Sequence, residues 1–275
     1  MTAAGVLCRW NVRAVLRDRW FAATAAAFAV LAVAASAVAL AGAGIVGVSS
    51  FDRAAAALVQ LTMLFVPLIG LTVGAGWIAA DRESGALALL LAQPVDRRAV
   101  FTGQFAGVAT AIAAAILVGY GAAGALLAVR AGTEHLGSFV WMVALAVLLA
   151  VAMLAIGFAI SAVAPNRSHA LGVAVLWWLV LVVVSDLGVL GTAAMLRLPA
   201  PALMALVSVN PVSAFRIGAI VAVGSTETIG PVGIYVAERL GTVGLSGGLV
   251  AVLVAWALGA FWVGRTRFAR APVDG

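Results

Sequence analysis

The sequence predicts an all-α, polytopic membrane protein with six transmembrane helices. Of its 275 residues, 65% are hydrophobic and only 9% are charged, whereas about a quarter of the residues in a soluble domain carry charge. The apolar stretches between the charges reach about 20 residues or more, the length that a helix needs to cross a bilayer. This composition excludes a soluble enzyme, a disordered chain and a disulfide scaffold. The single Cys8 cannot form an internal disulfide.

Residues 1–19 form a basic arm before the first span. Three of its arginines recur at every fourth position and therefore share one face of a helix. They are Arg9, Arg13 and Arg17. Trp10 belongs to a neighbouring apolar stripe, which is typical of an interfacial helix on the inner leaflet. A plain positive anchor for the first span is compatible with the same residues.

Six apolar stretches predict a transmembrane domain over residues 20–264, followed by a cytoplasmic tail, residues 265–275. The stretches are residues 20–51, 54–80, 99–129, 136–166, 170–196 and 242–264. Pairs of glycines four residues apart let helices approach closely. They occur at Gly70 and Gly74, Gly103 and Gly107, and Gly244 and Gly248. In so glycine-rich a chain they predict tight packing but identify no specific interface.

The distribution of arginine predicts that both termini are cytoplasmic. All 16 basic residues are Arg. With six spans, the side opposite the termini holds only Arg53, Arg130, Arg197, Arg216 and Arg239. Cytoplasmic loops carry the excess of positive charge, so we expect a multi-pass protein of a bacterial or archaeal cytoplasmic membrane. The net positive charge then marks topology and not a nucleic-acid surface.

The loop between the second and third spans, residues 81–98, is the first candidate for a functional segment. Its residues combine charges, a glycine, leucines and a proline. They are Asp81, Arg82, Glu83, Gly85, Leu87, Leu90, Leu91, Pro94, Arg97 and Arg98. Gly85 permits a turn and Pro94 ends a helix, which predicts a short helix with the three leucines on one face. Either the membrane surface or a soluble partner has to bury that face.

The stretch between the fifth and sixth spans, residues 197–241, is the second candidate. Two apolar pieces flank Asn210-Pro211, and each is too short to cross about 30 Å of hydrocarbon. A seventh span made from both would move the C-terminal arginines outside, so we expect the stretch to face the outside or to dip part-way into the membrane. Asn210 is a good N-cap and Pro211 fits a first helical turn, with Arg216 one to two turns on.

Asp186 is the third candidate. An ionisable group within a span is costly in lipid, so it faces the bundle interior or a water-filled cavity. Asp186 therefore supports a transport path or a dimer interface, unless the fifth span ends near Ser185 and places it at the outer interface.

The order of residues 81–98 resembles the coupling segment of ABC-2 type permeases, the membrane subunits of ATP-binding-cassette transporters. The resemblance covers almost the whole chain. Its further elements are the basic arm, residues 65–68, Gly103 with Gln104, and Asn210-Pro211 with Phe215-Arg216. Gln104 stands where the family usually has Lys. Residues 177–187 are similar to the permease subfamily of nitrous-oxide-reductase maturation transporters.

The resemblance implies a dimer of this chain on two separate ATPase subunits, which hold ATP and Mg²⁺. It also implies that residues 81–98 dock in a cleft of each ATPase, whose closure tilts the attached helices and switches access across the membrane. Short gate helices would close the outer mouth and meet an extracytoplasmic accessory protein. The cargo would be copper- or sulfur-related.

The absence of Lys agrees with an ATPase on another chain. A P-loop requires a Lys that reaches the nucleotide phosphates, and this sequence has none. We therefore expect a permease subunit that is not itself an enzyme and that contains no catalytic residue, cofactor or metal site.

Other functions make different demands on the sequence. A drug, lipid or other small-molecule exporter of the same family would carry the same coupling loop. An ion-coupled secondary transporter would need intramembrane ionisable groups and usually repeated halves, and only Asp186 qualifies. An intramembrane protease would need a His beside Ser246, but His169 is expected at the opposite membrane face and His135 in a loop.

Overall fold

The computed structural model describes residues 3–17, 19–41, 49–184, 209–223 and 230–270. Within these residues every regular element is a helix. The helices are α1 (Ala3–Arg17), α2 (Arg19–Ala41), α3 (Ser50–Glu83), α4 (Ala86–Leu91), α5 (Arg97–Ala131), α6 (Leu136–Val163), α7 (Arg167–Leu179), the π-helix η1 (Val180–Val184), α10 (Pro211–Val223) and α11 (Gly230–Arg270).

Five helices of the described chain are long and apolar enough to cross a membrane. They are Phe21–Ala41, Ser50–Glu83, Arg97–Ala131, Leu136–Val163 and Gly244–Arg270. The predicted fifth span, residues 170–196, is described only as far as Val184, where α7 and η1 form a shorter apolar helix. An all-helical membrane bundle is therefore confirmed.

Several helix boundaries differ from those predicted. Ser49 caps α3 by accepting a hydrogen bond from the Asp52 N–H at 3.1 Å, so residues 50–53 open the second span instead of separating it from the first. α11 begins at Gly230, inside the predicted outer segment, and continues through the predicted tail to Arg270. In both places a capped or uninterrupted helical run extends past the charges that we used as boundaries.

Helix α6 lies at the centre of the bundle and packs against α3, α5, α7, α10 and α11. Its crossing with α3 is especially close because glycines face backbone there. A Cβ atom on Gly74 would lie 2.7 Å from the Leu154 carbonyl oxygen, and one on Gly157 would lie 2.6 Å from the Leu71 carbonyl oxygen. Only glycine allows the two helices to approach this far.

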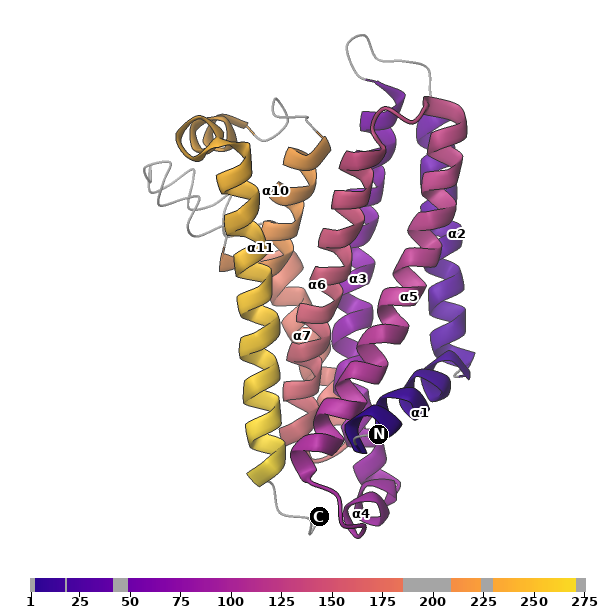
Figure 1. Cartoon of the computed structure of the whole chain (residues 1–275), viewed down its shortest axis with the longest axis vertical. Helices are drawn as coiled ribbons and strands as arrows, with labels where there is room; N and C mark the ends of the chain where they lie inside the picture. Colours follow the sequence, from indigo (N-terminus) through magenta and orange to yellow (C-terminus); the bar gives the residue numbers. More distant parts are fainter. Residues whose placement is uncertain (1–2, 18, 42–48, 185–208, 224–229, 271–275) are drawn as a thin grey trace.

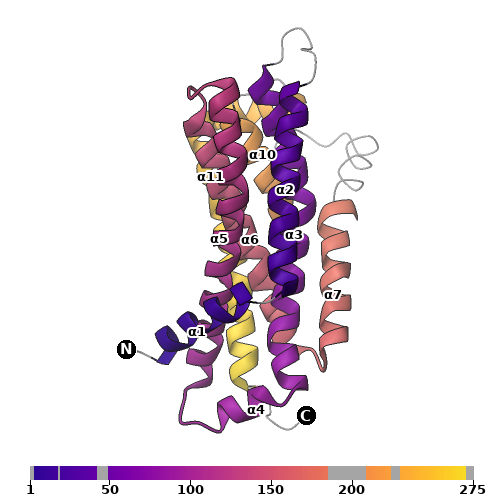
Figure 2. The ribbon, with the colours of Figure 1, turned by 90° about the vertical axis from the view of Figure 1, so that its right-hand side faces the viewer.

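Different helices lie at the two ends of the bundle. Figure 1 shows α4, the start of α7 and the C-terminal end of α11 at one end, and Figure 2 shows α1 projecting sideways near that same end. α10 lies in the other half of the bundle, beside α6 and α11. The loop 81–98 and the basic arm therefore lie at the same end.

Candidate functional site

Helix α4 forms the tip of the loop between α3 and α5. Ser84 ends α3, and Gly85 then adopts a positive φ of 76°, a left-handed conformation that favours glycine. The Leu89 N–H donates to the Gly85 carbonyl at 3.3 Å and closes the first turn of α4. The predicted turn at Gly85 is confirmed, and it reverses the chain so that α4 lies against the end of α3.

The predicted apolar face of α4 is covered by the chain itself. Leu87 is buried, and Leu90 and Leu91 are half-buried against the hydrophobic core. Leu89 instead points outward with 76% of its surface exposed. Gln93, Pro94, Asp96 and Arg98, which follow it in the sequence, are also exposed. A partner at this tip would therefore meet Leu89 and not the face that the leucine spacing indicates.

Asp81 joins α3 to α5. The Gln104 amide donates to the Asp81 carboxylate at 2.8 Å, and Gln104 is only 2% exposed. Gln104 thus provides an uncharged hydrogen-bond donor from α5 to the end of α3. The hydrogen bond needs no positive charge on α5.

Arg82 joins α3 to the end of α6. Its guanidinium donates to the carbonyls of Ser161 at 3.3 Å and Ala162 at 3.2 Å, and also to that of Ala164. The last carbonyls of a helix have no partner within the helix, and a cation there also complements the helix dipole. Arg82 therefore connects the end of α3 to the last turn of α6.

Glu83 joins α3 to α7. Its carboxylate accepts a hydrogen bond from the Arg167 N–H at 3.2 Å, at the first residue of α7. A negative charge is favourable at a helix N-terminus. Three consecutive residues at the end of α3 thus reach three different helices.

The start of α5 contains a residue that sequence reasoning missed. Asp96 caps the helix by accepting from the Arg98 N–H at 3.2 Å. The sequence could have indicated this cap, because an Asp directly before a helical run is a common N-cap. Of the two predicted arginines, Arg98 is exposed and Arg97 is half-buried.

A second missed residue, Ser161, links α6 to α3. Its hydroxyl accepts the Ala79 N–H at 2.9 Å and is completely buried. No pattern in the sequence indicates the role of this serine, because its partner lies 82 residues earlier in the chain.

Asn210 connects the start of α10 with the first turn of η1. Its side-chain oxygen accepts the Val212 N–H at 2.9 Å, and its amide nitrogen donates to the Leu181 carbonyl at 2.7 Å. Asn210 and Pro211 are both buried, and Arg216 is half-buried on α10. Helix α10, which belongs to the predicted outer segment, therefore packs within the bundle. Asp186 lies outside the described residues.

The arginines of the arm face outward. Arg9, Arg13 and Arg17 are exposed, and Trp10 beside them is 65% exposed. The opposite face of α1 packs on α5, where a Cβ atom on Gly107 would lie 2.5 Å from the Asn11 Cβ. The predicted basic face is confirmed as an exposed surface. In the described chain, no group of three or more His, Cys, Asp or Glu could hold a metal ion.

Comparison with known proteins agrees with this architecture. The family model described as "ABC-2 family transporter protein" matches residues 6–273. The probable ABC transporter permease protein NosY of Pseudomonas aeruginosa is 34% identical over 194 residues, which are 69% of this chain and 70% of that protein. The protein of the same name from Stutzerimonas stutzeri is 33% identical over 176 residues, 62% of this chain and 64% of that protein. With a family match over nearly its whole length, this chain belongs to the ABC-2 transporter family.

Proposed function

We propose that this chain is the permease subunit that converts ATP hydrolysis on a separate ATPase into movement of helices across the membrane. The observation that carries the proposal is the hydrogen bonding at the end of α3. Asp81, Arg82 and Glu83 reach α5, α6 and α7 respectively. A displacement of α4 is therefore passed to three helices at once, without an intervening flexible loop.

The docking surface for the ATPase is the exposed tip of α4 together with the start of α5. Leu89 supplies an apolar contact, and Arg98 at the start of α5 supplies a positive charge; both side chains are exposed. The predicted residues Leu87, Leu90 and Leu91 then hold α4 in place from inside.

The assembly in this proposal contains a second copy of the chain and two ATPase subunits that bind ATP and Mg²⁺. The end of the bundle that carries α1 and α4 is cytoplasmic, which puts the exposed arginines of the arm on the inner leaflet. The segment around Asn210, Pro211 and Arg216, together with Asp186, serves the transport path or its outer gate. Six crossings result if α7 and α10 share one of them.

Charge reversal at Arg98 tests the coupling role. In proteoliposomes that contain the permease and its ATPase, Arg98→Glu should reduce the stimulation of ATP hydrolysis by about tenfold, equivalent to about 1.4 kcal/mol of lost interaction. Arg130→Glu is the matched control, since Arg130 is also exposed but lies in the last turn of α5. Equal stimulation by Arg98→Glu and the wild type would refute the assignment.

The two NosY relatives favour a role in nitrous oxide reductase maturation over export of drugs or lipids. A strain that lacks its NosY permease should regain nitrous oxide reductase activity when it expresses this chain with its cognate ATPase. The Arg98→Glu variant should not restore it. If activity stays absent while the chain assembles with the ATPase, the cargo belongs to another class of ABC-2 transporter.

A further inference from the structure

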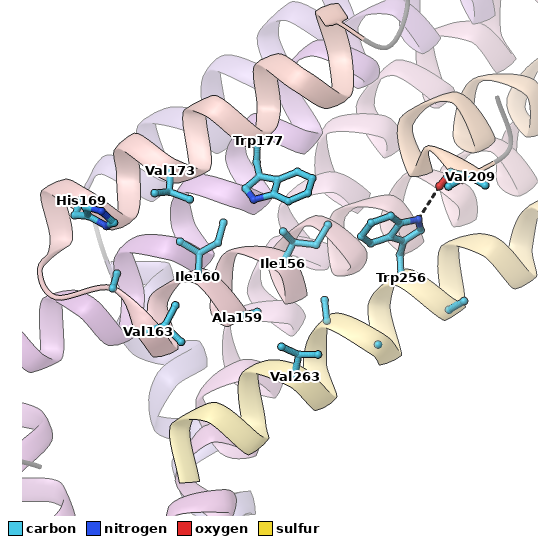
Figure 3. A pocket seen from close by; sticks show the side chains of 14 residues that line it. Ile156, Ala159, Ile160, Val163, His169, Val173, Trp177, Val209, Trp256 and Val263 are labelled. Carbon is cyan, nitrogen blue, oxygen red and sulfur yellow. Dashed lines mark hydrogen bonds between the residues drawn. The ribbon is translucent and has the colours of Figure 1, made fainter. Parts of the chain in front are cut away.

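An apolar groove runs along the outside of the bundle between α6, α7 and α11. Its volume is about 840 Å³, and its floor is formed by one face of α6, including Ile156 and Ile160. Figure 3 shows α7 as one wall, with Val173 and Trp177, and α11 as the other, with Trp256 and Val263. None of the described lining residues is acidic.

The groove has two different ends. The indole rings of Trp177 and Trp256 lie at one end, where Trp256 Nε1 donates to the Val209 carbonyl at 2.7 Å. At the other end, near the terminus of α6, His169 lines the groove. Arg267 is exposed and lies four residues after Val263, so it continues the groove-lining face of α11 by one turn.

The length of the groove is set by the helices that line it. His169 and Trp177 are eight residues apart on one helical run, which corresponds to about 12 Å along its axis. An apolar groove of this length, with aromatic rings at one end and basic side chains at the other, accommodates part of an acyl chain joined to a negatively charged head group. Basic pockets between transmembrane helices are suited to anionic lipid head groups.

We propose that this groove is a binding site for one anionic phospholipid, with an acyl chain against α6 and the head group beside His169 and Arg267. Charge complementarity favours a lipid over a second copy of this chain. The basic end of the groove would face the basic end of its copy if two grooves met. The assignment to the inner leaflet rests on the proposed orientation, but binding itself does not depend on transport or on the ATPase.

Gly259 offers a way to fill the groove. It lines the α11 wall, and a Cβ atom there meets nothing within 4 Å, so a larger side chain enters the groove without a clash. Gly121 is the matched control, because it is also exposed on a long helix with nothing within 4 Å of its Cβ position. It lies on α5, away from the groove.

Native mass spectrometry of the purified full chain, titrated with palmitoyl-oleoyl phosphatidylglycerol or phosphatidylcholine, tests the site. We expect one retained phosphatidylglycerol that Gly259→Leu weakens by about tenfold, about 1.4 kcal/mol, while Gly121→Leu leaves it unchanged. Arg267→Gln should remove the preference for phosphatidylglycerol over phosphatidylcholine, and Arg130→Gln should keep it. Equal retention by all variants, or no preference in the wild type, would overturn the proposal.

A labelling experiment covers the case in which Gly259→Leu does not fold. Cys8 is the sole cysteine, so a Cys8→Ser chain that also carries Gly259→Cys has one thiol in the groove. Phosphatidylglycerol, but not phosphatidylcholine, should protect this thiol from a maleimide. Oxidative cross-linking between two copies through that thiol would show instead that the groove receives a second chain, and the lipid proposal would be wrong.

Discussion

At the scale of single residues, the hydrogen bond between Gln104 and Asp81 shows what holds the start of loop 81–98 to α5. Gln104 is 2% exposed and donates to the carboxylate at 2.8 Å. Gln104→Leu should lower the free energy of unfolding by about 1–3 kcal/mol, because a half-buried carboxylate loses its donor. Gln104→Lys should keep most of the stability by offering a charged donor. Thermal unfolding in detergent measures both.

A control for this prediction lies two residues earlier on the same helix. Thr102 is half-buried, and its hydroxyl donates to the Arg98 carbonyl within the same helix and not to another element, so Thr102→Ala should change stability little. If Gln104→Leu is as stable as Thr102→Ala, the Asp81 bond does not contribute. The charges at 81–83 could be predicted as a functional group from sequence. Their partners could not, since Ser161 and Arg167 lie about 80 residues away along the chain.

At the scale of helices, the crossing of α3 and α6 depends on Gly74. Its Cβ position lies 2.7 Å from the Leu154 carbonyl oxygen and 3.1 Å from the Gly157 Cα. Gly74→Ala should therefore push the helices apart and destabilise the bundle by about 1–3 kcal/mol, the usual effect of overpacking. The shift in thermal unfolding, and the loss of ATPase stimulation in the assembled transporter, measure the effect.

Gly248→Ala is the matched control, because nothing lies within 4 Å of that Cβ position and alanine favours a helix over glycine by up to about 1 kcal/mol. A destabilisation of the same size in both variants would contradict the close-crossing argument. The sequence contains three such glycine pairs. Only the structure separates them: Gly70 and Gly74 meet α6, Gly107 meets α1, and Gly248 meets no neighbour. Spacing alone cannot say which helix lies opposite.

At the scale of the whole molecule, composition was enough to predict a helical membrane bundle, whereas the course of the fifth span was not predictable. Within the described residues the long apolar runs are helical, because a backbone in lipid has no hydrogen-bond partner other than its own chain. The position of α10 could not be predicted in this way. It depends on a hydrogen bond from the Asn210 side chain to the Leu181 carbonyl, in the middle of the predicted fifth span. A tertiary hydrogen bond of this kind leaves no periodic trace in the sequence.

The placement of the ends leads to a prediction about topology. The five candidate spans lie in α2, α3, α5, α6 and α11, and the end of α11 lies with α4 and α1 in Figures 1 and 2. We predict a sixth crossing between α6 and α11, shared by α7 and α10, because five crossings would put the two ends on opposite sides of the membrane. Cysteine accessibility in a Cys8→Ser background measures this. Ser84→Cys and Thr266→Cys, both at exposed residues, should react only with reagents that reach the cytoplasmic side, and Thr133→Cys only with reagents outside. Labelling of Thr266→Cys from the same side as Thr133→Cys would show that α7 and α10 do not complete a span.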